Sequence, residues 1–204
     1  DEYIAANGID PKIPPIEILD VNFADHVNAG KSAKSRASRM LHAARHHISI
    51  HLHEDPAFFT TLSEKLEQIL QDLKDNWTEL ERELQRFIDE ELKQGREQEV
   101  EGLDPKVQAP FFGLLKEAIE TSSGQSPEGE SFRTAVTTTI EIVDHIKAEI
   151  ARVGFWRDPP SRQRLENWVY RSLRRSRLVS NDQVQELAIR FVDLAKSRHR
   201  FLVA

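Results

Sequence analysis

Hydrophobic residues recur at spacings of three and four along most of the chain, which is the period of an amphipathic α-helix. The first clear run extends from Ala37 to Leu52 and predicts a helix over residues 32–53, with Ser32 capping its first turn. Before this run, three prolines interrupt a short apolar segment, which favours an extended arm with room for one turn of helix. The pattern therefore predicts an arm over residues 1–30 and a single helical domain over residues 31–204.

The next run of apolar positions covers about residues 56–93. Asp55 and Pro56 form a strong helix start, because Asp can accept hydrogen bonds from free N–H groups and Pro fits the first helical position. No Gly or Pro interrupts residues 57–94. The run therefore predicts a coiled-coil-like element, either one very long helix or a pair of helices.

An extra step of four residues before Trp77 is compatible with either alternative. The step shifts the phase of the hydrophobic positions, and Thr78 with Glu81 could form a capping box at the same place. Two helices that meet near residues 75–76 would explain both features. One continuous helix with a change of phase remains the other interpretation.

Helical patterns continue to the C-terminus without a convincing strand. Asp104 and Pro105 predict a helix start, and Pro110 predicts a kink in that helix. Further runs predict a helix whose apolar stripe extends from Phe132 to Val153, a helix that opens at residues 158–159 and a last helix near residues 181–199. The predicted fold class is all-α, an irregular multi-helix bundle.

Composition narrows the cellular setting. Hydrophobic residues make up 39 % of the 204 residues, which is enough for a real core. The absence of cysteine excludes disulfides and thiolate metal sites, and it suits a cytoplasmic protein. No apolar run approaches the ~20 residues of a membrane helix. The chain starts at Asp1 without an initiating Met, so we expect a piece of a larger protein.

Charge is distributed unevenly, although the net charge is −6. Residues 31–47 carry five basic residues and no acid, whereas Asp and Glu dominate residues 54–101. Residues 151–180 contain eight arginines, no lysine and only two acids. This asymmetry predicts separate basic surfaces.

Two short motifs suggest chemistry but have simpler explanations. Residues 30–32 (Gly-Lys-Ser) resemble the end of a phosphate-binding loop, yet the motif requires a glycine where this chain has Asp25. Five histidines between His42 and His53 include pairs at i, i+4, a spacing that suits a shared metal ion. On a regular helix, however, the five do not converge. We therefore predict helix capping for the first motif, structural or interface histidines for the second, and no metal, cofactor or catalytic residue.

The arginines of residues 160–176 give the clearest candidate site. On a regular helix four of them fall within a sector of about 100°, away from the apolar positions that include Trp168; they are Arg164, Arg171, Arg174 and Arg175. Guanidinium groups suit bidentate contacts with carboxylates or phosphates. A protein interface, contact with DNA phosphates and ordinary surface ion pairing are the three interpretations that remain open.

Several segments together resemble the C-terminal part of the R (restriction) subunit of type I restriction-modification enzymes. The resemblance covers about 170 residues and rests on a pattern, not on an active-site motif. It is carried by residues 42–73, 75–77, 102–105, 108–111, 155–157 and 194–196. In that family the large subunit has a nuclease domain, two ATP-driven motor domains that translocate DNA, and a C-terminal helical domain that docks onto the methyltransferase and specificity subunits.

The resemblance implies a non-catalytic assembly module. The parent subunit would use ATP and Mg²⁺ as an ATP-dependent site-specific endonuclease, but neither the nuclease residues nor the phosphate loop of the motor occurs in this chain. The expected partners are the methyltransferase and specificity subunits, with DNA reached through the complex. The alternative is a helical domain that contacts duplex phosphates and guides DNA to the motor.

Overall fold

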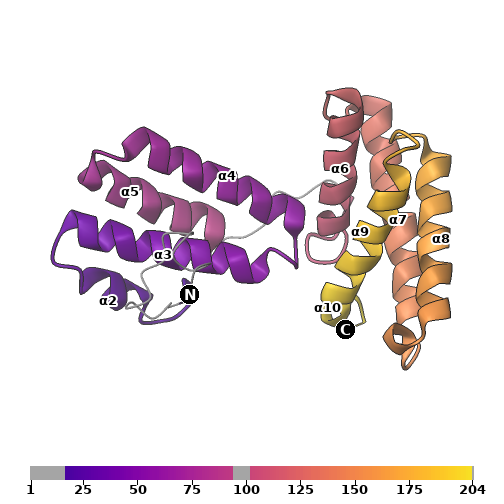
Figure 1. Cartoon of the computed structure of the whole chain (residues 1–204), viewed down its shortest axis with the longest axis horizontal. Coiled ribbons are helices and arrows are strands. Elements are labelled where there is room, and N and C mark those ends of the chain that lie inside the picture. Colours follow the sequence, from indigo (N-terminus) through magenta and orange to yellow (C-terminus); the bar gives the residue numbers. More distant parts are fainter. Residues whose placement is uncertain (1–16, 94–101, 204) are drawn as a thin grey trace. The chain divides into compact units, whose positions relative to one another are not determined.

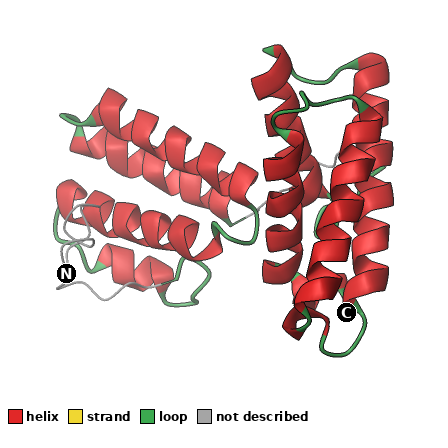
Figure 2. Cartoon of the chain, turned by 45° about the vertical axis from the view of Figure 1, so that its right-hand side comes forward, coloured by secondary structure: helices red, strands yellow, loops and turns green. Residues whose placement is uncertain are grey.

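The computed structural model describes residues 17–93 and 102–203, and these residues form helices and loops without a strand (Figure 2). The all-α prediction is confirmed. The prediction treated residues 31–204 as a single domain, whereas the structure divides the chain into two compact units. The first unit comprises the described residues up to 52 together with residues 59–93, and the second comprises residues 53–58 and the described residues from 102 onward.

The first unit is built around helix α3, which contacts α2, α5 and the π-helical turn η1 (Figure 1). The elements of this part of the chain are α2 (Phe23–Asn28), α3 (Ala33–His51), α4 (Pro56–Leu73), α5 (Trp77–Phe87) and η1 (Ile88–Leu92). Ser32 accepts a hydrogen bond from the N–H of Ser35 at 3.2 Å, so its predicted role as a cap is confirmed. Asp55 likewise accepts from the N–H of Phe58 at 3.2 Å at the start of α4.

Two helices, not one, occupy residues 56–87. They meet at Asn76, whose side chain accepts the N–H of Glu79 at 3.2 Å and so caps α5. The predicted capping box of Thr78 and Glu81 was wrong by two residues, because an Asn earlier in the turn supplies the cap. Glu81 instead forms a bidentate ion pair with Arg36 of α3, with N–O distances of 2.6 and 2.9 Å.

The predicted extended arm lies partly outside the described residues, which begin at residue 17. Residues 17–30 contain a turn and α2, and they bury Ile18, Phe23 and Val27. Gly30 then brings the backbone close to α3, since a Cβ at this position would lie 2.8 Å from Cγ of Arg36. Its carbonyl accepts a hydrogen bond from that same arginine at 3.2 Å. Close packing therefore accounts for the glycine of the Gly-Lys-Ser segment.

The second unit is a four-helix bundle. Its long helices are α6 (Ala109–Ser123), α7 (Gly129–Ile150), α8 (Pro159–Ser176) and α9 (Val184–Ser197), and it also contains the short η2 (Phe155–Arg157) and α10 (His199–Leu202). Each long helix contacts two others, in the closed order α6, α7, α8, α9 and back to α6 (Figure 1). The core belongs entirely to residues 103–202, with Phe111 and Phe191 fully buried and their ring centroids 5.6 Å apart.

Two predictions for this unit were wrong. Helix α6 starts at Ala109 and not at Pro105, because the side chain of Asp104 holds a turn by accepting the N–H groups of Lys106 and Val107, both at 2.8 Å. Pro110 therefore lies in the first turn, where its missing N–H removes no helical hydrogen bond and it produces no kink. Val153 is fully exposed, because α7 ends at Ile150 and the chain has left the apolar face.

Among the residues that the structure describes, no helix combines the length and the apolar character that a membrane-spanning segment requires.

Candidate functional site

Helix α8 carries the predicted arginines and is positioned by a well-defined start. Asp158 accepts the N–H of Ser161 at 3.2 Å, and the two prolines of the first turn need no hydrogen-bond acceptor. Leu165, Val169 and Leu173 are buried in the bundle core. One face of α8 is therefore fixed, and the orientation of the remaining side chains follows from it.

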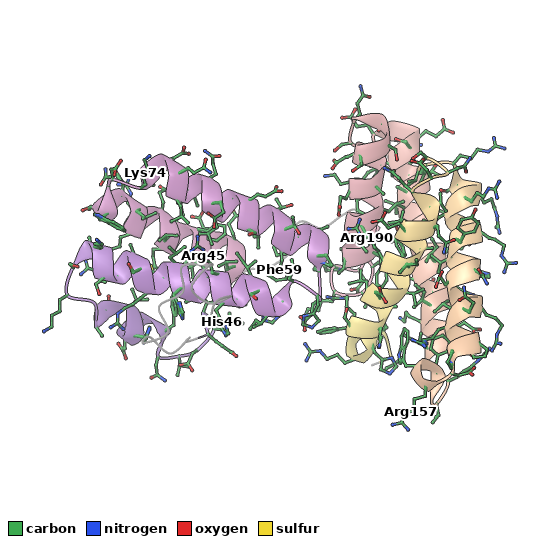
Figure 3. All side chains as sticks on the ribbon, viewed as in Figure 1. Arg45, His46, Phe59, Lys74, Arg157 and Arg190 are labelled. Atoms are coloured by element: carbon green, nitrogen blue, oxygen red, sulfur yellow. The ribbon has the colours of Figure 1, made fainter. Side chains whose placement is uncertain are left out.

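All four predicted arginines lie on the exposed side of α8. On the outer side of this helix, side chains that end in nitrogen atoms extend away from the bundle (Figure 3). Arg164 lies 3.8 Å from a carboxylate oxygen of Asp158, and Arg175 lies 3.8 Å from one of Glu141. Arg171 and Arg174 form no ion pair with another described residue. Arg164 also donates a hydrogen bond to Oγ of Ser161 at 2.6 Å, whereas the guanidinium groups of Arg171 and Arg174 remain available.

A groove of about 600 Å³ runs between α7 and α8. Leu165 and Trp168 supply apolar surface to it, and three arginines, Arg152, Arg164 and Arg171, line it together with Glu149. The structure therefore brings two of the predicted arginines into one concave site. Arg174 and Arg175 are not among the lining residues, although Arg175 reaches Glu141 of α7.

An aromatic pair crosses this groove. The ring of Trp168 stacks on His145 of α7, with the centroids 3.7 Å apart and the planes inclined by 14°. The prediction placed Trp168 among the core positions, away from the arginines. The half-buried ring does pack against the core. Its separation from the arginines was wrong, because the ring lines the groove together with Arg164 and Arg171.

Glu149 and Arg152 were missed by sequence reasoning. They form an ion pair on α7 at 2.9 Å, in which the carboxylate is mostly covered and the guanidinium is exposed. Arg152 belongs to the arginine-rich segment, but it precedes α8 and so escaped a helical-wheel argument. His145 gave no signal at all, because its role depends on a contact between two helices.

The histidines of α3 are distributed around that helix. His42 and His47 are buried, and the ring centroids of His47 and His51 lie 4.5 Å apart. The ring of His51 also stacks on Phe59 of α4, at 5.8 Å. Among the described parts of the chain, no three His, Asp or Glu side chains are arranged to hold a metal ion.

Comparison with protein-family models, with curated proteins and with solved structures gives no match.

Proposed function

We propose that this chain is the helical assembly module of a type I restriction enzyme R subunit. It docks the ATP-dependent DNA translocase and endonuclease onto the methyltransferase–specificity core, and it performs no chemistry of its own. The proposal joins the sequence resemblance to one structural observation. This observation is a row of exposed arginines on α8, of which Arg171 and Arg174 form no ion pair with another described residue and Arg164 and Arg175 have carboxylates only at 3.8 Å.

The arginine side of α8 supports a binding role better than a stabilising one. Exposed ion pairs contribute only about 0–1 kcal/mol to stability, and these pairs are long. Arginine is also the cation best suited to bidentate contacts with carboxylates. The four exposed arginines of α8, in a segment that has eight arginines and no lysine between residues 151 and 180, are therefore suited to a specific partner.

Binding of the chain to the purified methyltransferase–specificity complex tests the proposal. The wild-type chain should form a complex on size exclusion, and Arg171→Glu with Arg175→Glu should weaken it while the circular dichroism spectrum stays unchanged. Absence of binding by the wild-type chain would show that the proposal is wrong.

Duplex DNA provides the competing outcome in the same experiment. If these arginines contact phosphates, the double reversal should lower affinity for duplexes of any sequence and reduce the salt dependence by about one unit of slope per lost contact. With a net charge of −6, the wild-type chain should bind duplex only weakly at physiological salt.

A further inference from the structure

The exposed residues of α8 that face α7 follow a regular row. Arg164, Trp168, Arg171 and Arg175 are separated by steps of four, three and four, so they lie along one line of the helix. This spacing is that of the seam by which one helix packs against another. Leu165 and the other core positions lie beside this row, and within the row only the half-buried Trp168 packs against the core, so the three arginines are not part of the core.

Helix α7 supplies the opposite rim of the groove. Glu141, His145, Glu149 and Arg152 follow one another at steps of four, four and three. The two rims run antiparallel, because Glu141 approaches Arg175 at 3.8 Å and His145 stacks on Trp168 at 3.7 Å. On this side the residues that line the groove run from 145 to 152, which is about 10 Å or roughly two helical turns. The groove is thus long enough for about two turns of a partner helix.

Charge specifies the occupant of this groove. Across the two rims there are four arginines and two glutamates. Glu149 is already paired with Arg152 at 2.9 Å, whereas Arg171 has no carboxylate partner among the described residues. The free charge in the groove is therefore positive and is flanked by aromatic and aliphatic surface from Trp168 and Leu165. An anionic partner with an apolar side chain at its centre complements both features.

An acidic helix fits these rims better than a nucleic-acid strand. A phosphate chain laid between the rims would pass beside the carboxylates of Glu141 and Glu149, which repel it. A helix can instead place its carboxylates opposite the arginines of α8 and an apolar residue opposite Trp168, because its side chains repeat with the same steps of three and four.

We infer that the groove between α7 and α8 binds an acidic amphipathic helix of the partner protein, with Arg164 and Arg171 pairing with its carboxylates and Trp168 contacting its apolar residue. The inference rests on the proposed function for the identity of the partner, the methyltransferase–specificity core. It adds which surface is used and what chemistry the core presents to it.

Two arginines in different places give a matched test of this site. Arg171 lines the groove, whereas Arg133 is exposed near the start of α7, does not line the groove and lies outside the arginine row of α8. Binding of the full chain to the core complex should weaken at least about tenfold in Arg171→Glu, as for loss of a central interface contact. Arg133→Glu makes the same change of charge and should alter binding less than about threefold. Trp168→Ala should weaken binding as strongly as Arg171→Glu, and circular dichroism must show that its fold is kept.

Photo-crosslinking identifies the occupant directly. A benzoylphenylalanine in place of Asn167, another residue that lines the groove, should crosslink to a helical segment of the core that is rich in Asp and Glu. A crosslink to a segment without acidic residues, or to DNA, would overturn the inference. If Arg171→Glu and Trp168→Ala bind the core as strongly as the wild-type chain does, the inference is overturned but the proposed function is not, because the core would then dock elsewhere. Failure of the wild-type chain to bind the core would overturn both proposals.

Discussion

Replacing Phe191 with alanine tests whether the two units unfold independently. This side chain is fully buried in the second unit and pairs with Phe111 at 5.6 Å. Removing a buried phenyl ring costs about 3–5 kcal/mol, from the lost transfer free energy and the cavity left behind. The core around Phe191 contains only residues 103–202. We therefore expect the free energy of unfolding to decrease for the second unit and to stay unchanged for the first.

Hydrogen exchange measured by mass spectrometry resolves this effect by segment. A loss of about 3–5 kcal/mol corresponds to exchange that is roughly 150- to 5,000-fold faster for amides that open by global unfolding of the unit. Peptides of α7 and α9 should show this change, and peptides of α3 and α5 should not. Leu84→Ala provides the reciprocal control, because Leu84 is fully buried in α5 and should affect the first unit alone. Equal loss of protection in all four helices would refute the reasoning and would support the single domain over residues 31–204.

Three further predictions concern local features. Burial, and secondarily the charge of Arg39, lowers the pKa of His26 below its ordinary 6.5. The folded chain therefore binds fewer protons at His26 than the unfolded chain, and stability is lost as the pH falls through 6.5. Urea titrations at pH 7.5 and 5.5 should show that the free energy of unfolding falls less between these two pH values in His26→Gln than in the wild type. An equal fall in both proteins would contradict this. Asn76→Ala removes the cap that holds the N–H of Glu79 and should lower the free energy of unfolding of the first unit by about 1 kcal/mol; an unchanged urea midpoint would argue against the cap. Zinc should raise the melting temperature little, because the histidines of α3 are distributed around that helix, and a chelator-reversible stabilisation above ~2 kcal/mol would disprove this.

Local signals in the sequence were sufficient to predict most helix positions. The start of α3 at Ser32, of α4 at Asp55 and of α8 at Asp158 followed from residues that form their own side-chain caps. The predicted helix start before Pro110 was wrong, because a residue that can cap a helix has another role there. Asp104 was taken as a helix cap, but it uses its carboxylate to close a turn, and nothing in the spacing distinguishes these two uses.

The spacing of hydrophobic residues along the sequence could not predict contacts between helices. Trp77 illustrates this, because it belongs to the apolar run of residues 56–93, yet it is 37 % exposed and Lys34 of α3 lies 4.9 Å from its ring centroid. The division into two units also depends on which helix faces pair, and a hydrophobic period reports only that a face is apolar. The arginines of α8 could be found, since they lie on one helix, but their aromatic neighbour His145 could not.

Helix α8 has one face buried in the bundle and one face exposed, and this bears on how the proposed site can be tested. Leu165, Val169 and Leu173 hold the helix in the bundle. Arg164 and Arg171 contribute to the groove from an exposed face that the core does not need. Because exposed arginines add little to stability, reversing their charge should change binding without unfolding the bundle. A reversal that did unfold the second unit would mean that the arginines act in the fold, and the case for a docking surface on α8 would lose its main support.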